Sequence, residues 1–158
     1  MARFVVVLPL VALTEGDDFA AARWPLHVTL VEPFPTSLGA EEVAAVLGSV
    51  DGIGREARAL HARGGEPAMF GRRHDVPVTL VVDGGELAAL RGRTIAALQH
   101  AGVELHPRPD YRPHVTRKDH GRVRPGDRIV LGTVALVDLR PPEGAHHRRV
   151  VAAWPLGT

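Results

Sequence analysis

The sequence predicts an α+β fold whose sheet is mostly antiparallel, and three observations support this class. The 158 residues include 17 glycines and 13 prolines, which separate several short valine-rich runs and favour many strands over a long helical bundle. Two amphipathic helical patterns each lie within a run of such strands. Hydrophobic residues make up 45% of the chain, enough for a core, so we expect a single domain over residues 1–158.

The strand predictions rest on apolar runs bounded by turn-forming residues. Pro33 should end the second run, because proline cannot donate to a sheet ladder. Residues 19–25 should connect the first two strands, with room for one helical turn, and Gly132 should kink the seventh strand. The eight predicted strands cover residues 3–11, 26–32, 55–63, 67–70, 76–82, 114–118, 128–139 and 148–154.

Two helices are predicted from capping residues and helical periodicity. Ser37 is the expected N-cap of a helix that runs to about residue 47. Glu41 and Glu42 would lie in its first turns, where the helix dipole favours acidic side chains. The second helix should run from Gly85 to about residue 100, because leucine and isoleucine recur there on one face.

The composition excludes several classes of function. The chain has no cysteine, so disulfides, thiolate metal sites and cysteine nucleophiles are excluded. A net charge of +1 argues against a surface that coats nucleic acid generally, so any anion binding must be local. The apolar N-terminal run is short and is broken by Pro9, and no run approaches the roughly 20 residues of a membrane span. We therefore expect a soluble, cytoplasmic monomer without a membrane partner.

Two copies of the tripeptide His-Val-Thr, at residues 27–29 (the first motif) and 114–116 (the second motif), are the most informative feature. They lie 87 positions apart, and both fall on predicted strands. Side chains alternate between the two faces of a strand, so the histidine and threonine of each motif share one face while the valine points to the other. Each motif therefore presents an imidazole beside a hydroxyl. The alternative is a pair of unrelated, half-buried strand histidines.

Two imidazoles and two hydroxyls brought together can cleave a phosphodiester or a 2',3'-cyclic phosphate by in-line displacement without a metal. An imidazole has an ordinary pKa of about 6.5, so one histidine can accept a proton while the other donates one. The threonine hydroxyls would donate to the non-bridging oxygens, where negative charge builds up. The residues alone do not identify the base, because both imidazoles are of the same type.

The chain resembles the two-histidine (2H) phosphoesterase superfamily, which includes the 2'-5' RNA ligase-like proteins and the cyclic phosphodiesterases. The resemblance rests on the two motifs and their spacing and on three flanking segments: Pro33-Phe34, Phe70-Gly71 and Tyr111-Arg112-Pro113. It implies a bilobal fold, with two mostly antiparallel sheets facing a central cleft and helices packed on the outside. It also implies a catalytic set of four residues: His27, Thr29, His114 and Thr116.

The resemblance implies an activity as well. Members cleave 2',3'-cyclic phosphates or 2'-5' linkages without a metal, and some catalyse reversible ligation. The implied partners are RNA ends or small nucleotides, with no cofactor. A second hypothesis, from another class, is a non-catalytic module that binds a nucleotide or RNA end in the same cleft. The intact histidine and threonine of both motifs favour the enzyme, since a pure binder would not need all four.

Two cations that follow the second motif are candidate substrate contacts. Lys118 should share a face with Thr116, so it is the better-placed cation for a phosphate, whereas Arg117 should point away. Arg117 stands where the family usually has an apolar residue. Its presence indicates either an edge strand or a substrate that carries extra phosphates.

Three further residues are candidate substrate contacts. Arg72 lies in a loop after Phe70-Gly71 and could reach a polyanion, with a merely solvated loop as the alternative. Tyr111 and Phe34 flank the motifs and could stack on a base, with core packing as the alternative for Phe34. Three further histidines fit no standard metal-ligand spacing, so we expect no metal site. These are His120, His146 and His147.

Overall fold

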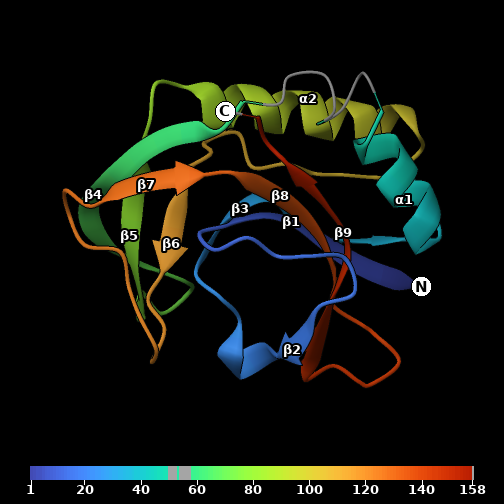
Figure 1. The fold of residues 1–158 in the computed structure, drawn as a ribbon, viewed down its shortest axis with the longest axis horizontal. Helices are drawn as coiled ribbons and strands as arrows, with labels where there is room; N and C mark the ends of the chain where they lie inside the picture. Colours follow the sequence, from blue (N-terminus) through green and yellow to red (C-terminus); the bar gives the residue numbers. More distant parts are fainter. Residues whose placement is uncertain (50–52, 54–57, 158) are drawn as a thin grey trace.

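The chain folds into one curled β-sheet with two α-helices on one side (Figure 1). The structure is a computed structural model that describes residues 1–49, 53 and 58–157. In these residues the sheet has nine strands in the order β2-β9-β8-β1-β3-β6-β5-β4-β7, and neighbouring strands are antiparallel. The predicted α+β class with a mostly antiparallel sheet is confirmed. The elements in chain order are β1 (Ala2–Pro9), β2 (Asp18–Ala20), a 3-10 turn (Ala21–Arg23), β3 (His27–Thr36), α1 (Ala40–Leu47), β4 (Leu60–Phe70), β5 (Val76–Val82), α2 (Glu86–His100), β6 (His114–Thr116), β7 (Arg128–Leu131), β8 (Thr133–Asp138) and β9 (His147–Pro155).

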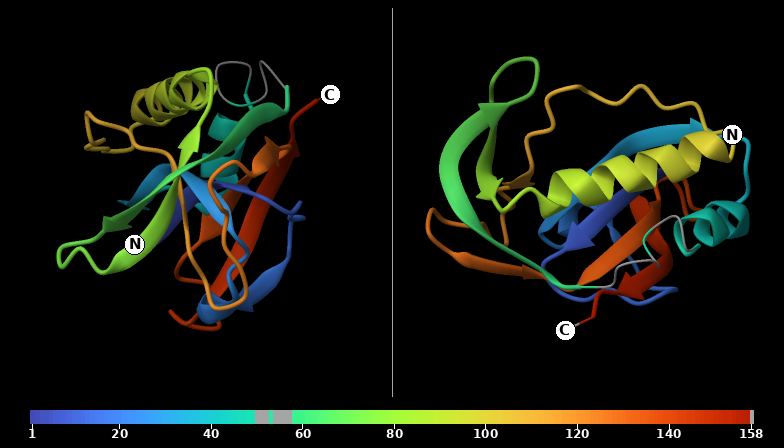
Figure 2. Two further views of the ribbon diagram at one scale, coloured as in Figure 1. Left: turned by 90° about the vertical axis from the view of Figure 1, so that its left-hand side faces the viewer. Right: turned by 90° about the horizontal axis from the view of Figure 1, so that it is seen from above.

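The curl of the sheet follows from the connection between β7 and β8. Only Gly132 separates these strands, yet β7 is the last strand on one side of the sheet and β8 lies near the other side. The two ends of the sheet must therefore approach each other, and Figure 2 shows the resulting half-barrel. The prediction of one strand kinked at Gly132 is wrong in this respect, because the glycine divides two strands with different partners.

The two sheets that the resemblance implied are joined into one. β2, β9, β8, β1 and β3 form one half of the strand order, and β6, β5, β4 and β7 form the other. The halves meet where β3 pairs with β6, at Val28 opposite Val115. The expectation of separate sheets is therefore corrected to two halves of a continuous sheet, and the seam between them lies at the centres of the two His-Val-Thr motifs.

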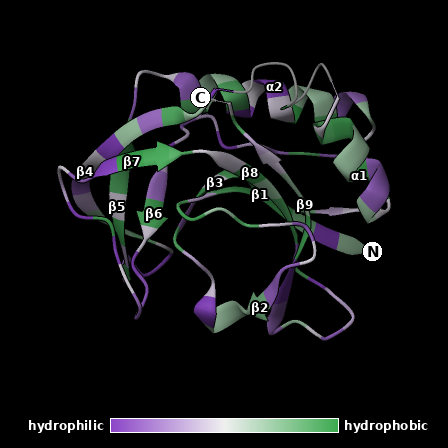
Figure 3. Cartoon of the chain, in the orientation of Figure 1, coloured by the Kyte–Doolittle hydropathy of each residue, from purple (hydrophilic) through white to green (hydrophobic). Residues whose placement is uncertain are grey.

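The main core lies between the sheet and the two helices. Val28, Val115 and Leu87 of α2 belong to it and are almost fully buried. A smaller cluster, which includes Val5 and Val7, fills the opposite face of β1. β1 is thus buried on both faces, which explains its nearly continuous apolar sequence. Figure 3 shows hydrophobic residues along β1 and also along β7.

The helices are amphipathic elements of this core. α2 contributes a row of buried leucines to the side of the sheet that the motif valines face. The motif histidines and threonines must therefore lie on the opposite face of the sheet, away from the helices.

Neither helix in the described part of the chain has the length and apolar composition needed to cross a bilayer.

Two strands differ from the predictions in length. β3 continues through Pro33 and Pro35, so the prediction that Pro33 ends it is wrong. Past the seam β3 pairs only with β1, and a strand edge without a neighbour is where prolines are tolerated. β4 is one strand over residues 60–70 rather than two, with a register shift between Gly64 and Pro67. Residues 55–57 of the predicted strand lie outside the described residues.

Smaller differences concern the ends of elements. Gly39 caps α1, and its N–H donates to the Glu42 carboxylate at 3.1 Å, so the prediction of Ser37 as the cap is wrong. β6 ends at Thr116, two residues earlier than predicted. The short strand β2 was not predicted, because three residues carry too little periodicity to be recognised.

Gly64 is required by a close approach between two segments. A Cβ at this position would overlap the carbonyl oxygen of Arg124, so Gly64→Ala should lower the free energy of unfolding by about 1–3 kcal/mol, measured by urea denaturation. Gly92→Ala is the matched control, because its Cβ would meet open space on an exposed face of α2. Alanine there should raise stability by about 0.5–1 kcal/mol. A Gly64→Ala protein as stable as the wild type would contradict the assignment.

Candidate active site

The two motifs lie side by side on adjacent strands. The antiparallel pair between Val28 and Val115 places residue 27 beside residue 116 and residue 29 beside residue 114. Both valines point into the core, so alternation directs the four polar side chains to the opposite face of the sheet. The structure thus brings together the four residues that were predicted as a catalytic set, in two crossed pairs: His27 with Thr116, and Thr29 with His114.

Both imidazoles are held in the same way by their own chain. The Nδ1 atom of His27 lies 2.8 Å from the Pro25 carbonyl oxygen, and the Nδ1 atom of His114 lies 2.8 Å from the Arg112 carbonyl oxygen. A carbonyl can only accept, so each Nδ1 carries the hydrogen and donates it. In the neutral ring this leaves the lone pair on Nε2, and in the charged ring Nε2 carries the second proton. Nε2 is therefore the atom available for proton transfer in both histidines.

An aromatic ring packs against each imidazole and restricts its rotation. Trp24 stacks on His27 with ring centroids 4.4 Å apart and an interplanar angle of 25°. Phe70 meets His114 at the same centroid distance but edge to face, at 63°. Trp24 was not singled out in the sequence, although an aromatic residue stands three positions before the histidine in both motifs. Together with the carbonyl contacts, this packing holds each ring in one orientation.

His27 is held in its neutral form. Burial is the main cause that lowers its pKa, and the charges of Lys118 and His114 lower it further, while the hydrogen bond to Pro25 opposes them. The net result is a pKa of about 4. At neutral pH His27 is therefore a proton acceptor. The same effect shows that the Lys118 ammonium lies within electrostatic reach of His27.

The lowered pKa of His27 couples folding to pH. An unfolded histidine titrates at about 6.5, so the unfolded chain binds more protons than the folded one between pH 6.5 and 4. The contribution of His27 to stability is full above pH 6.5 and falls as the pH decreases toward 4, by about 3 kcal/mol in all. Urea denaturation of His27→Gln should show a weaker loss over this range than the wild type. An NMR titration midpoint near 6.5 for the His27 ring would contradict the assignment.

A cleft of about 450 Å³ opens beside Thr29 and His114. This volume falls in the usual range for small-molecule sites. Cationic, acidic and aromatic side chains contribute to its wall, whereas His27 and Thr116 lie beyond its edge. The lining residues are Thr29, Glu32, Pro33, Met69, Phe70, Gly71, His74, Arg108, Asp110, Tyr111, Arg112 and His114.

A buried arginine from α2 binds the backbone of β3 just after the first motif. The Arg91 guanidinium donates to the Leu30 carbonyl and to the Glu32 carboxylate, both at 2.9 Å, although Arg91 as a residue is only 4% exposed. Its second terminal nitrogen donates to the Arg108 carbonyl at 3.4 Å. Leu30 and Glu32 lie in the stretch of β3 where the register with β1 shifts. Arg91 therefore satisfies the buried Leu30 carbonyl and pairs with the Glu32 carboxylate, whose side chain is partly exposed.

Tyr111 continues this support toward the second motif. Its ring lies under the Arg91 guanidinium, with the central carbon 4.5 Å from the ring centroid. Its hydroxyl donates to the Thr29 carbonyl at 2.8 Å. Burial raises the pKa of Tyr111, which keeps the hydroxyl protonated as a donor. Because Tyr111 stands three residues before His114, one hydrogen bond links the backbone of the first motif to the approach of the second.

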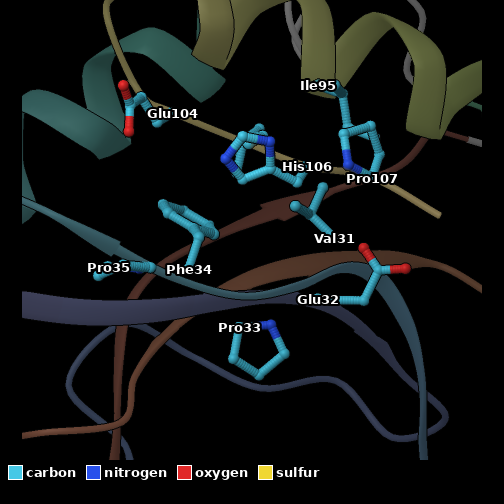
Figure 4. Close-up of a pocket in the computed structure, with 10 residues that line it drawn as sticks. Val31, Glu32, Pro33, Phe34, Pro35, Ile95, Glu104, His106 and Pro107 are labelled. Atoms are coloured by element: carbon cyan, nitrogen blue, oxygen red, sulfur yellow. The ribbon is translucent and has the colours of Figure 1, made fainter.

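Phe34 does not lie in the cleft. It is 2% exposed, and its ring packs on Phe4 with centroids 6.2 Å apart. Figure 4 shows it under a smaller pocket of about 180 Å³, with His106 above it and Ile95 of α2 nearby. The expectation that Phe34 stacks on a base is therefore wrong, because the continuation of β3 through Pro33 turns its side chain into the core.

Three residues that were predicted to contact the substrate lie outside the lining of the cleft. Arg72 belongs to the exposed turn after β4, and its neighbours Gly71 and His74 line the cleft in its place. Arg117 is exposed and lies, with Lys118, in a separate hollow beyond the second motif. Their substrate contacts remain predictions, as does that of Tyr111, which lines the cleft.

Several site residues were missed in the sequence. Arg91 had a usable signal, since it stands one turn after Leu87 on the apolar face of a predicted helix, where a charge needs a partner. Arg112 belongs to a flanking segment of the second motif, but no contact was predicted for it. Arg108 had no signal, because periodicity does not predict the path of its loop. No group of three or more potential metal ligands gathers anywhere in the described residues. His120 instead approaches the Trp24 carbonyl oxygen at 3.1 Å through Nε2.

Comparison with known proteins identifies a family match. A family model described as the 2'-5' RNA ligase superfamily matches residues 7–124, a range that includes both motifs. No curated protein matches the chain by sequence.

Solved structures resemble the chain over nearly its whole length. E. coli LigT complexed with 3'-AMP is 16% identical, with a TM-score of 0.63 and 99% of each chain covered. TT0787 of Thermus thermophilus is 18% identical, with a TM-score of 0.65, 99% of this chain and 98% of that chain covered. A protein described as a phosphoesterase is 15% identical, with a TM-score of 0.62 and 99% of each chain covered. Structures of E. coli LigT with NADP+, ATP and phosphate are also similar. At these identities the likeness shows the fold.

Proposed function

The chain belongs to the 2'-5' RNA ligase superfamily, and from this premise we propose that it is a metal-independent phosphodiesterase for 2',3'-cyclic phosphates or 2'-5' linkages of RNA ends or nucleotides. Membership implies phosphodiesterase activity in general terms. The pairing of Val28 with Val115 carries the finer proposal, because it puts two imidazoles and two hydroxyls on one face of the sheet. Such a set contains an acid, a base and donors for the phosphate oxygens.

In this proposal the two histidines have different roles in hydrolysis of a cyclic phosphate. Neutral His27 accepts a proton from water at Nε2 as the water oxygen forms a bond to phosphorus. The opposite bond, from phosphorus to a ribose oxygen, breaks in line, and the Nε2–H of protonated His114 gives its proton to that oxygen. Solvent returns both imidazoles to their starting forms. In the ligation direction the two roles reverse.

The threonines stabilise the charge that builds up on the phosphate. Thr116 stands beside His27 and Thr29 beside His114, so each hydroxyl is directed to the same space as the imidazole next to it. Hydrogen bonds to the non-bridging oxygens strengthen as the transition state forms. This division of labour needs no metal, because proton transfer and charge stabilisation both come from side chains.

The cleft is the proposed place for the nucleoside. Arg108 and Arg112 bring positive charge to a wall that also holds aromatic residues, a combination suited to a nucleotide. The central carbon of the Arg112 guanidinium lies 4.9 Å from the Phe70 ring centroid, and both residues line the cleft. E. coli LigT has been solved with 3'-AMP and with ATP, which supports nucleotide binding in this fold.

The direct test is hydrolysis of 2',3'-cyclic nucleotides and 2'-5' dinucleotides by the purified chain in the presence of EDTA. The proposal predicts turnover that is unaffected by the chelator. Activity that disappears with EDTA would contradict the metal-free mechanism. Tight binding of these nucleotides without turnover of any of them would instead identify the chain as a binding module that uses the same cleft.

A further inference from the structure

The turn after the second motif carries a concentration of positive charge. In the described residues from 117 to 124, which we call the basic turn, four cationic side chains and one acidic side chain occur within eight positions. With Asp127 they line one hollow of about 570 Å³. The four cations are Arg117, Lys118, Arg122 and Arg124. For a chain with a net charge of +1, this is a local excess.

The four cationic side chains of the basic turn form no ion pair in the described part of the chain. The two salt bridges in the described part of the chain join other residues, so none of these cations has a carboxylate partner within 4.0 Å there. Asp127 is occupied in a different way, since its carboxylate accepts from the backbone N–H of Arg124 at 2.9 Å. The guanidinium groups of the basic turn are therefore available to an external anion.

The basic turn is continuous with the candidate active site. Lys118 affects the pKa of His27, and Gly121 lies against Leu26, the residue before that histidine. His120 reaches the Trp24 carbonyl, and Trp24 in turn stacks on the His27 ring. The turn therefore borders the His27 end of the site and is braced against the segment that leads into β3.

The cleft lies at the other end of the site. Thr29 and His114 line the cleft, whereas His27 and Thr116 do not, and Lys118 lines the hollow. The sequence of features along this face is therefore cleft, histidine pair and basic turn. A phosphate between the two imidazoles would have the cleft on one side and free cations on the other.

From this arrangement we infer that the basic turn is a second anion subsite, which binds a further phosphate of the substrate, one linkage away from the reacting phosphorus. The inference rests on the proposed function and names its substrate class: a nucleotide chain with more than one phosphate, rather than a simple cyclic mononucleotide. Arginine suits this role, because its planar fork donates two hydrogen bonds to one phosphate. The charge of Arg117, which sets this motif apart from the family pattern, then serves the neighbouring phosphate.

The test compares two substrates with the same reacting group. One is a 2',3'-cyclic mononucleotide without other phosphates, and the other is a trinucleotide that ends in the same cyclic phosphate. The wild type should favour the trinucleotide in kcat/KM by about tenfold or more. In a plot of log kcat/KM against log salt concentration, the slope should become shallower by about one for each arginine contact that a variant removes. The double variant Arg122→Gln/Arg124→Gln should lose most of this preference. A third substrate, the cyclic mononucleotide with a 5'-triphosphate, distinguishes a polyphosphate from a strand as the source of the second phosphate.

The control for the loss of positive charge elsewhere on the surface is Arg140→Gln. Arg140 is exposed, and its guanidinium donates to the carbonyl of Met1, near the N-terminus, which Figure 1 shows on the opposite side of the molecule from β6. The control removes one positive charge away from the basic turn and should keep the wild-type ratio of the two kcat/KM values. Equal kcat/KM for all three substrates in the wild type would overturn the subsite and leave the phosphodiesterase intact. Absence of hydrolysis of every substrate would overturn the proposed function itself.

Discussion

Replacing His27 or His114 by alanine is expected to lower kcat for a 2',3'-cyclic nucleotide by about 10²- to 10⁴-fold in each case, with a much smaller change in KM. The size of the loss is that of a general acid or base removed from its reaction. KM should change little because, in this account, the nucleoside is bound by the cleft and the imidazoles act mainly on the transition state. Steady-state kinetics of the two variants, with circular dichroism to confirm folding, measure the effect.

Two comparisons make this prediction specific. His61→Ala removes an exposed histidine of β4 and should keep wild-type kinetics. The double variant His27→Ala/His114→Ala should lose less than the product of the two single losses, because residues that act as a unit are not additive. A single variant that retains more than about a tenth of the wild-type kcat would contradict the role of that histidine in proton transfer.

Replacing Arg91 by methionine is expected to lower the free energy of unfolding by about 3–5 kcal/mol. The substitution leaves the Leu30 carbonyl without its donor and the Glu32 carboxylate without its cation, and both changes are costly inside a protein. Because Glu32 is partly exposed, water can solvate part of its charge, which favours the lower end of this range. Chemical denaturation measures the change.

Arg93→Met is the control on the same helix. Its Nε atom has no hydrogen-bond partner among the described residues, so its loss should change stability by less than about 0.5 kcal/mol. Arg91→Lys should recover part of the stability, because it restores the charge but not the fork that reaches two acceptors. Equal stability of the Arg91→Met and Arg93→Met proteins would contradict the assignment of Arg91 as the support of the first motif.

Local chemistry made much of the fold predictable. Turn residues and apolar runs located both helices and most strands, and strand alternation predicted that the histidine and threonine of each motif share a face. The partners of each strand were harder to infer, because pairing depends on contacts between distant residues. The two halves of the run at 128–139 look like one strand, yet β7 pairs with β4 and β8 pairs with β1 and β9.

The candidate site shows the same limit. The motifs could be found from residue types and spacing, but their relative placement depends on one pair, Val28 with Val115, that no local pattern specifies. Phe34 was misjudged because β3 continues past two prolines, which only its open edge permits. Arg91 is a charge on the otherwise apolar face of a predicted helix, which indicates that it has a partner but not which one. Its partners are carbonyl groups of β3 and a distant loop, which the sequence does not bring together.

The proposed mechanism requires the two motifs to form one site that acts on a single phosphate. A crystal structure of the chain with 3'-AMP or inorganic phosphate tests it most directly. We expect one phosphate with the Nε2 atoms of both His27 and His114 at about 3 Å from its oxygens, and with the hydroxyls of Thr29 and Thr116 donating to it. A phosphate held by only one imidazole, or bound away from both motifs, would contradict the mechanism.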